Sequence, residues 1–244
     1  MNTFLFTSDK YANIVVDHAE LMNRFSGEKP EITVLGFSEP SSVYPSNYKF
    51  KSMGNQSDFP KKCWSEPIRP FIEEIKDDYF VMWWDDTFPI APINTTLFNE
   101  AVELVKTGVA QKVHFFWGSD KQNASCLDFN DNFKALSQTA EYRSALVPGV
   151  WNKEYFLRHL HTNFTPWDYE VRNMPDTTCD GANILIAKHE PIAPWVNMFR
   201  QGSFNSAMWN NYKTSPTGHF AWNEFQKLSP DVAEIVGKYE GIIL

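Results

Sequence analysis

The first half of the chain alternates short apolar runs with longer amphipathic segments. This alternation predicts strands over residues 3–7, 31–37, 48–53, 79–84 and 113–117, and helices over residues 10–25, 65–75 and 94–108. Short buried strands that alternate with helices of one apolar face build a sheet covered by helices. The pattern therefore predicts an α/β fold with a mixed sheet flanked by helices.

The second half is less regular and predicts an α+β arrangement. Strands are expected over residues 134–139, 145–150 and 183–187, with helices over 152–161 and 230–238, the last capped by Ser229. We find no internal repeat and no linker rich in proline, glycine or serine that would divide the chain. A length of 244 residues is enough to bury a sizeable core. We therefore expect a single domain over residues 1–244.

Charge and cysteine content restrict the class of partner and the compartment. A formal net charge of -8 argues against binding to nucleic acid or to anionic membranes, because both need a basic surface. The three cysteines lack CxxC spacing and predict neither a disulfide framework nor a zinc site. No apolar stretch approaches the roughly 18 residues of a transmembrane helix. A cytoplasmic protein is the simplest expectation.

The strongest local signal is an apolar run over residues 79–84 that ends in two carboxylates, Asp85 and Asp86. Open α/β sheets bind ligands at the carboxyl ends of such central strands. Adjacent carboxylates repel each other and lose hydration on burial, so they need a cation or strong hydrogen-bond donors. Mg²⁺ or Mn²⁺, shared with substrate phosphates, would meet that need. The alternative is a solvated turn in which Asp86 caps the segment that follows.

A second signal is the segment Pro166-Trp167-Asp168-Tyr169-Glu170. A carboxylate among aromatic side chains is partly desolvated, which raises its pKa toward the range of a general base. Glu170 is the candidate for this role. A surface glutamate on an amphipathic turn is the alternative interpretation of the same residues.

Several motifs, taken in order, resemble a microbial and viral family of GT-A-like glycosyltransferases, which use nucleotide-diphospho-sugars as donors. The resemblance covers roughly residues 3–172 and rests on Thr7-Ser8-Asp9-Lys10-Tyr11, Ser52-Met53-Gly54, Trp64-Ser65, Asp85-Asp86, the stretch 148–157 and Trp167-x-x-Glu170. Enzymes of this fold hold a divalent metal against the donor diphosphate with a DxD-type motif. The resemblance implies that role for Asp85 and Asp86, although this chain has Asp-Asp-Thr at the motif.

The same resemblance implies two halves of the site. Residues 1–120 would bind the nucleotide, and residues 121–244 would bind the acceptor. The nucleotide would lie beside Thr7, Ser8, Asp9, Lys10, Tyr11, Gly54 and Trp64, with a helix N-cap as a compatible role for Asp9. Glu170 would deprotonate the acceptor hydroxyl. Trp151 and Trp167 would shape the acceptor pocket, or else pack in the core.

Two further candidates lie later in the chain. His189 follows a predicted strand and is a possible third metal ligand or phosphate contact, but a lone histidine is more often structural or exposed. Arg200 is a candidate to pair with the diphosphate, because guanidinium groups bind phosphate in a bidentate manner. A surface salt bridge is the alternative for Arg200.

The expected function is metal-assisted transfer of a sugar from a nucleotide-diphosphate donor to a hydroxyl acceptor, such as a glycan, with inversion at the anomeric carbon. Two other functions stay open. One is a non-catalytic module of the same fold that binds a glycan or a nucleotide. The other is a metal-dependent phosphoesterase or nucleotidyltransferase, which would need further carboxylates, with Asp9, Asp120 and Asp128 as the candidates.

Overall fold

The structure, a computed structural model, describes residues 1–59, 63–116, 126–200, 203–207, 209–210 and 229–240. Its first strands run parallel to one another: β1 (Asn2–Phe6), β2 (Ile32–Gly36), β3 (Tyr48–Ser52) and β4 (Tyr79–Trp84). The chain moves from β1 outward to β2 and β3, then returns to the other side of β1 for β4. This reversal puts the ends of β1 and β4 at a topological switch point, where open α/β sheets bind ligands.

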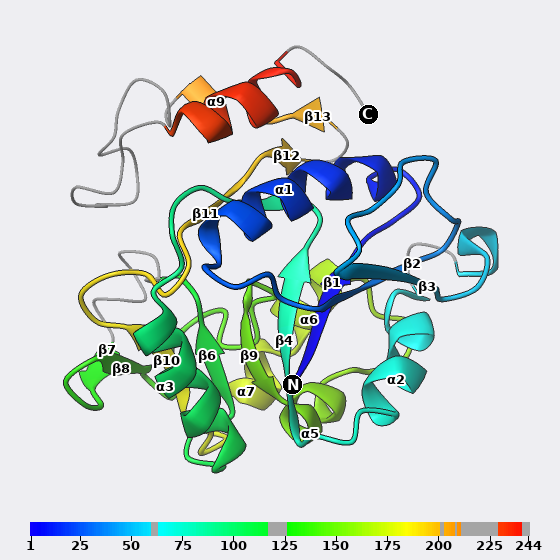
Figure 1. Cartoon of the computed structure of the whole chain (residues 1–244). Coiled ribbons are helices and arrows are strands. Elements are labelled where there is room, and N and C mark those ends of the chain that lie inside the picture. Colours follow the sequence, from blue (N-terminus) through cyan, green and yellow to red (C-terminus); the bar gives the residue numbers. More distant parts are fainter. Residues whose placement is uncertain (60–62, 117–125, 201–202, 208, 211–228, 241–244) are drawn as a thin grey trace.

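Later strands extend this sheet and make it mixed. They are β6 (Lys112–His114), β7 (Cys126–Asp128), β8 (Phe133–Leu136), β9 (Gly149–Asn152) and β10 (Ile184–Ala187). β9 lies antiparallel between β4 and β6, and β10 is parallel to β6. The sheet order within the described residues is β3-β2-β1-β4-β9-β6-β10-β8-β7 (Figure 1).

Two short antiparallel pairs lie outside the main sheet. β5 (Thr87–Pro89) follows β4 directly and pairs with β11 (Trp195–Asn197), so a late segment is held beside the end of β4. β12 (Phe199–Arg200) pairs with β13 (Ser203–Phe204). The first of these pairs bears on the candidate site, because it fixes residues 195–197 next to the carboxyl edge of the sheet.

Helices cover both faces of the sheet. On one face lie α1 (Val15–Phe25), preceded by the 3-10 helix η1 (Ala12–Ile14), and α3 (Thr95–Lys106). On the other face lie α2 (Ser65–Glu73), α5 (Lys153–Arg158) and α6 (Pro166–Arg172), which is followed by α7 (Met174–Thr177). A further 3-10 helix, η2 (Gln56–Asp58), lies in the connection that leads from β3 to α2.

The core follows the period-2 alternation of the strands. In β1, Leu5 packs against α1 on one face, whereas Phe4 and Phe6 pack toward α2 and α5 on the other. α9 (Pro230–Gly237) adds a third apolar cluster, packing on the outer side of α1 through Val232 and Val236 (Figure 1). None of the helices in the described ranges is long and apolar enough to cross a membrane.

The predicted elements of the first half are confirmed to within a few residues. Asn94 caps α3 as expected, because its side chain accepts a hydrogen bond from the Leu97 amide at 3.0 Å. Ser229 stands at the N-cap position of α9 but makes no capping hydrogen bond with its side chain. The predicted strand over 113–117 is confirmed in β6, and Trp117 lies outside the described residues.

The strand predicted over residues 145–150 is largely wrong, since the sheet takes up only Gly149–Asn152. Ala145 and Leu146 use their backbone groups elsewhere. The Ala145 carbonyl accepts from the Lys112 side chain, and the Leu146 amide donates to Glu170. The apolar residues before Gly149 have the pattern of a strand. The side chains that bind the backbone of Ala145 and Leu146, those of Lys112 and Glu170, are remote in the sequence and leave no mark on that pattern.

Candidate active site

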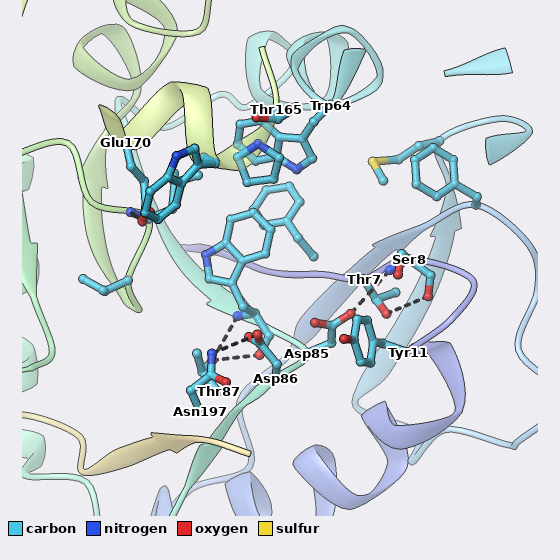
Figure 2. A pocket seen from close by; sticks show the side chains of 18 of the residues that line it. Thr7, Ser8, Tyr11, Trp64, Asp85, Asp86, Thr87, Thr165, Glu170 and Asn197 are labelled. Carbon is cyan, nitrogen blue, oxygen red and sulfur yellow. Dashed lines mark hydrogen bonds between the residues drawn. The ribbon is translucent and has the colours of Figure 1, made fainter. Parts of the chain in front are cut away.

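A cavity of about 790 Å³ opens at the carboxyl ends of β1 and β4 (Figure 2). Its lining comes from the ends of β1 and β4 and the loops after them, from the loops after β2 and β3, from the start of α2, from the segment before β9, from α6 and from β11. The lining residues are Phe6, Thr7, Ser8, Tyr11, Phe37, Met53, Gln56, Phe59, Trp64, Trp84, Asp85, Asp86, Thr87, Leu146, Val147, Thr165, Pro166, Trp167, Glu170, Trp195 and Asn197. The cavity therefore lies at the switch point of the sheet, and it brings together Asp85, Asp86 and Glu170.

Asp85 joins the ends of β1 and β4. Its backbone amide donates to the Phe6 carbonyl at 3.1 Å, and the Ser8 amide donates to its Oδ2 at 3.4 Å. Burial raises the pKa of Asp85 well above its ordinary value, and the charge of Asp86 raises it further; Thr7 and the Ser8 amide oppose the shift. The carboxyl group is thus held at the cavity with its negative charge only partly compensated.

Asp86 is held from the other side by β11. The Asn197 side-chain amide donates to its Oδ2 at 2.9 Å, and the Met198 amide donates to its backbone carbonyl at 2.9 Å. Burial raises the pKa of Asp86 to about 6; the Asn197 hydrogen bond opposes the shift, and the charge of Glu170 adds to it. Asn197 has no sequence signal of its own, because only the pairing of β5 with β11 brings it to Asp86.

The adjacent carboxylates fit a divalent cation. Among the described residues that line the cavity there is no lysine, arginine or histidine, so no basic side chain there offsets Asp85 and Asp86. Burial and neighbouring negative charge raise these carboxyl pKa values, and a bound cation would lower them again. Hard divalent ions take oxygen ligands from one or two carboxylates together with phosphates and water. In the described part of the chain no three His, Cys, Asp or Glu side chains gather into a complete ligand set.

His189 does not join these carboxylates, and the expectation of a third metal ligand is wrong. It is exposed, and its Nε2 lies 3.1 Å from the Asp131 carbonyl oxygen. It follows β10, which is three strand positions from β4, a separation of about 14 Å at the usual strand spacing. β4 and β10 end at the same edge of the sheet, but β9 and β6 lie between them.

Glu170 projects from α6, and this helix has a well-defined start. Thr165 and Asp168 form a capping box at its N-terminus, with Pro166 in the first turn. The Leu146 amide donates to Glu170 Oε1 at 2.6 Å. Burial raises the pKa of Glu170, and the Leu146 amide and the Lys112 charge oppose that rise.

The two sides of the cavity carry different chemistry. In Figure 2, Glu170 and Thr165 lie toward one side and Thr7, Ser8 and Tyr11 toward the other, with Asp86 between them. The first side presents a carboxylate on a helix. The second presents the loop that follows β1.

Asp9 and Lys10 are exposed and lie outside the cavity lining, unlike their neighbours Thr7, Ser8 and Tyr11. Asp9 does not cap a helix, since Tyr11 occupies the N-cap position of η1. Instead its Oδ1 accepts from the Ser38 amide at 2.7 Å, and its own amide donates to Gln56 Oε1 at 2.8 Å. Asp9 therefore ties together the loops after β1, β2 and β3 that form this side of the cavity.

Gly54 lies between the lining residues Met53 and Gln56 without lining the cavity itself. Its φ of +106° is disfavoured for other residues, and an added Cβ would lie 3.2 Å from the Phe59 ring. Gly54 therefore allows the conformation of the loop after β3 and does not contact the cavity directly.

Aromatic residues line much of the cavity. Trp64 stacks on Trp84 with ring centroids 5.5 Å apart, and it contacts Tyr169 of α6, so it lies toward the Glu170 side of the cavity. Trp167 lines the cavity with 63% of its surface exposed. Trp151 is 0% exposed and packs in the core, so the expectation that it shapes the acceptor pocket is wrong.

The backbone of Arg200 lies in β12, but its side chain falls outside the described part of the structure. Its predicted contact with the diphosphate stays a prediction. The lining residues that sequence reasoning missed come mainly from β11 and from the loops after β2 and β3. They include Phe37, Gln56, Phe59, Trp195 and Asn197.

No protein-family model and no curated protein matches the chain. Among solved structures it is similar to S. aureus TarS 1–349 in complex with UDP-GlcNAc, with 11% identity, a TM-score of 0.50, and 85% of this chain and 61% of that chain covered. A crystal structure of S. aureus TarS matches with 8% identity, a TM-score of 0.48, and 78% and 36% covered. An active-site mutant of LgtC matches with 15% identity, a TM-score of 0.38, and 65% and 60% covered.

The chain thus spans less than two thirds of the length of each of these proteins. Similarity at such low identity bears on the fold alone. The large mixed sheet flanked by helices corresponds to that of GT-A-like nucleotide-sugar transferases, which confirms the fold class expected from the sequence.

Proposed function

We propose that this protein is a glycosyltransferase that moves a sugar from a nucleotide-diphosphate donor to a hydroxyl acceptor. The observation that carries the proposal is the presence of Asp85, Asp86 and Glu170 in one cavity at the switch point of a GT-A-like sheet. The UDP-GlcNAc complex of the similar TarS structure supports a UDP-sugar as the donor class. One domain over residues 1–244 would supply a nucleotide-binding half up to about residue 120 and an acceptor half beyond it.

On the donor side, Asp85 and Asp86 would hold Mn²⁺ or Mg²⁺ against the diphosphate. Bound there, the ion would neutralise the charge that develops on the departing diphosphate. The raised pKa values of both carboxyl groups and the lack of basic side chains in the described lining support this assignment. Thr7, Ser8 and Tyr11 would contact the nucleotide from the loop after β1.

On the acceptor side, Glu170 would act as the general base. Its Oε1 accepts from the Leu146 amide, so we assign the proton of the acceptor hydroxyl to Oε2. The acceptor oxygen then bonds to the anomeric carbon while the bond from that carbon to the diphosphate oxygen breaks, which gives inversion. Trp64 and Trp167 would offer aromatic faces to a sugar acceptor.

Calorimetric titration of UDP and GDP, with and without Mn²⁺, tests the donor side. We expect binding of one nucleotide that needs Mn²⁺, that disappears in Asp86→Ala and that survives in Asp131→Ala, an exposed aspartate outside the cavity. No binding of either nucleotide would refute the proposal and favour the glycan-binding module.

Turnover of the nucleotide-sugar tests the chemistry. We expect release of the nucleoside diphosphate, with nucleotide binding kept and turnover lost in Glu170→Gln. Release of a nucleoside monophosphate would instead identify a phosphoesterase or nucleotidyltransferase.

A further inference from the structure

A lysine with no role in the proposed mechanism lies fully buried behind the cavity. Lys112, in β6, is 0% exposed. Its Nζ donates to the Ala145 carbonyl and lies 3.9 Å from the centroid of the Trp151 ring. Lysine is rarely buried without a charged partner, yet no carboxylate in the described part of the chain forms an ion pair with Lys112. Packing alone therefore does not explain why a lysine occupies this buried position.

One peptide group, that between Ala145 and Leu146, connects Lys112 to Glu170. The Ala145 carbonyl and the Leu146 amide belong to the same peptide group. The Lys112 Nζ donates to the oxygen of that peptide group, and the N–H of the same peptide group, from Leu146, donates to Glu170 Oε1 at 2.6 Å. Consecutive hydrogen bonds through one peptide group polarise one another and become stronger in a low-dielectric interior. The lysine and the carboxylate are thus connected through two hydrogen bonds and a single peptide.

We infer that Lys112 is a positioning residue for Glu170, which it orients and keeps ionised through the peptide between Ala145 and Leu146. The role of Glu170 as a base rests on the proposed function, but the coupling of the two side chains does not. Two backbone groups just before β9, the Ala145 carbonyl and the Leu146 amide, are therefore taken up by Lys112 and Glu170 and make no ladder bonds.

The other charged groups near Glu170 do not replace this connection. Asp86, at the end of β4, is itself a carboxylate, and the charge of Glu170 raises the pKa of Asp86, so these two groups repel each other. On α6 itself, Asp168 and Arg172 pair with each other at 3.2 Å. His114 follows Lys112 in β6, and burial, Lys112 and Arg143 all lower its pKa, which keeps the imidazole neutral. Burial also lowers the pKa of Lys112, and the charge of Glu170 opposes that shift.

A pH titration of the glutamate side-chain carboxyl carbons by ¹³C NMR tests the inference without any substrate. Glu170→Gln identifies the resonance. In Lys112→Met we expect the Glu170 midpoint to rise by about one pH unit, as is usual when a carboxylate loses a nearby positive charge. The matched control is Lys153→Met, because the Lys153 Nζ also donates to a backbone carbonyl, that of Ile75, at 2.9 Å. An unchanged Glu170 midpoint in folded Lys112→Met would overturn the inference.

The reverse titration needs no substitution of the buried lysine. Coupling between two sites is reciprocal, so the midpoint of Lys112, followed at its Cε, should fall by a similar amount in Glu170→Gln. A lysine that only satisfies the Ala145 carbonyl would show no such change, and that result would refute the inference even if Lys112→Met does not fold. If both shifts occur while no nucleotide-sugar is turned over, the coupling stands and the transferase proposal fails.

Discussion

Replacing Asp86 by asparagine should stabilise the metal-free protein at neutral pH. The substitution keeps the size of the side chain and leaves an oxygen that can accept from Asn197. It removes a negative charge that lies beside Asp85 and within the influence of Glu170. A residue assigned to metal binding is thus expected to reduce the stability of the free protein.

The magnitude follows from the pKa of Asp86, which is raised from 3.8 to about 6. A rise of about two units corresponds to about 3 kcal/mol, and water in the cavity reduces this, so we expect about 1–3 kcal/mol. A carboxyl group with a raised pKa binds its proton more tightly in the folded protein than in the unfolded chain. The free energy of unfolding therefore falls as the pH rises from about 4 to about 6, and the penalty is complete above that range.

Urea unfolding in the presence of a chelator measures the effect. Asp86→Asn should be more stable than the unsubstituted protein at pH 8, and the difference should shrink toward pH 4.5. The exposed Asp131→Asn serves as the control and should change neither stability nor its pH dependence. Equal or lower stability of Asp86→Asn at pH 8, or a difference that does not vary with pH, would refute the reasoning.

Three further predictions concern the core, the sheet and the acceptor side. Arg143→Met should cost about 3–5 kcal/mol in urea unfolding, because the fully buried guanidinium pairs with Asp180 at 2.9 Å and its loss leaves that carboxylate uncompensated; a cost below about 1 kcal/mol would contradict this. Gly149→Ala should cost about 1–3 kcal/mol, since its Cβ would lie 2.4 Å from the Val113 carbonyl oxygen, and unchanged thermal stability would be the contrary result. Trp167→Ala should change stability by less than about 0.5 kcal/mol but raise the KM for the acceptor in a turnover assay; an unchanged KM would place the acceptor elsewhere.

The sequence by itself determined the strands and helices of the first half of the chain and the position of the paired carboxylates. Periodicity is a local property, so the strands up to residue 84 can be recognised from their own residues, whichever segments pack against them. Asp85 and Asp86 follow such a run directly, so their place at the carboxyl edge did not depend on later parts of the chain. The Asn94 cap was equally local, because it needs only the amide three residues onward.

The tertiary structure alone decided which remote groups meet these carboxylates. Asn197 reaches Asp86 because β5 pairs with β11, and His189 stays apart because β9 and β6 lie between β4 and β10. Trp151, expected in a pocket, became a core residue beneath Lys112. Strand order and register arise from the packing of the whole chain, and no local pattern records them, so the partners of each catalytic candidate could not be predicted from its neighbours in sequence.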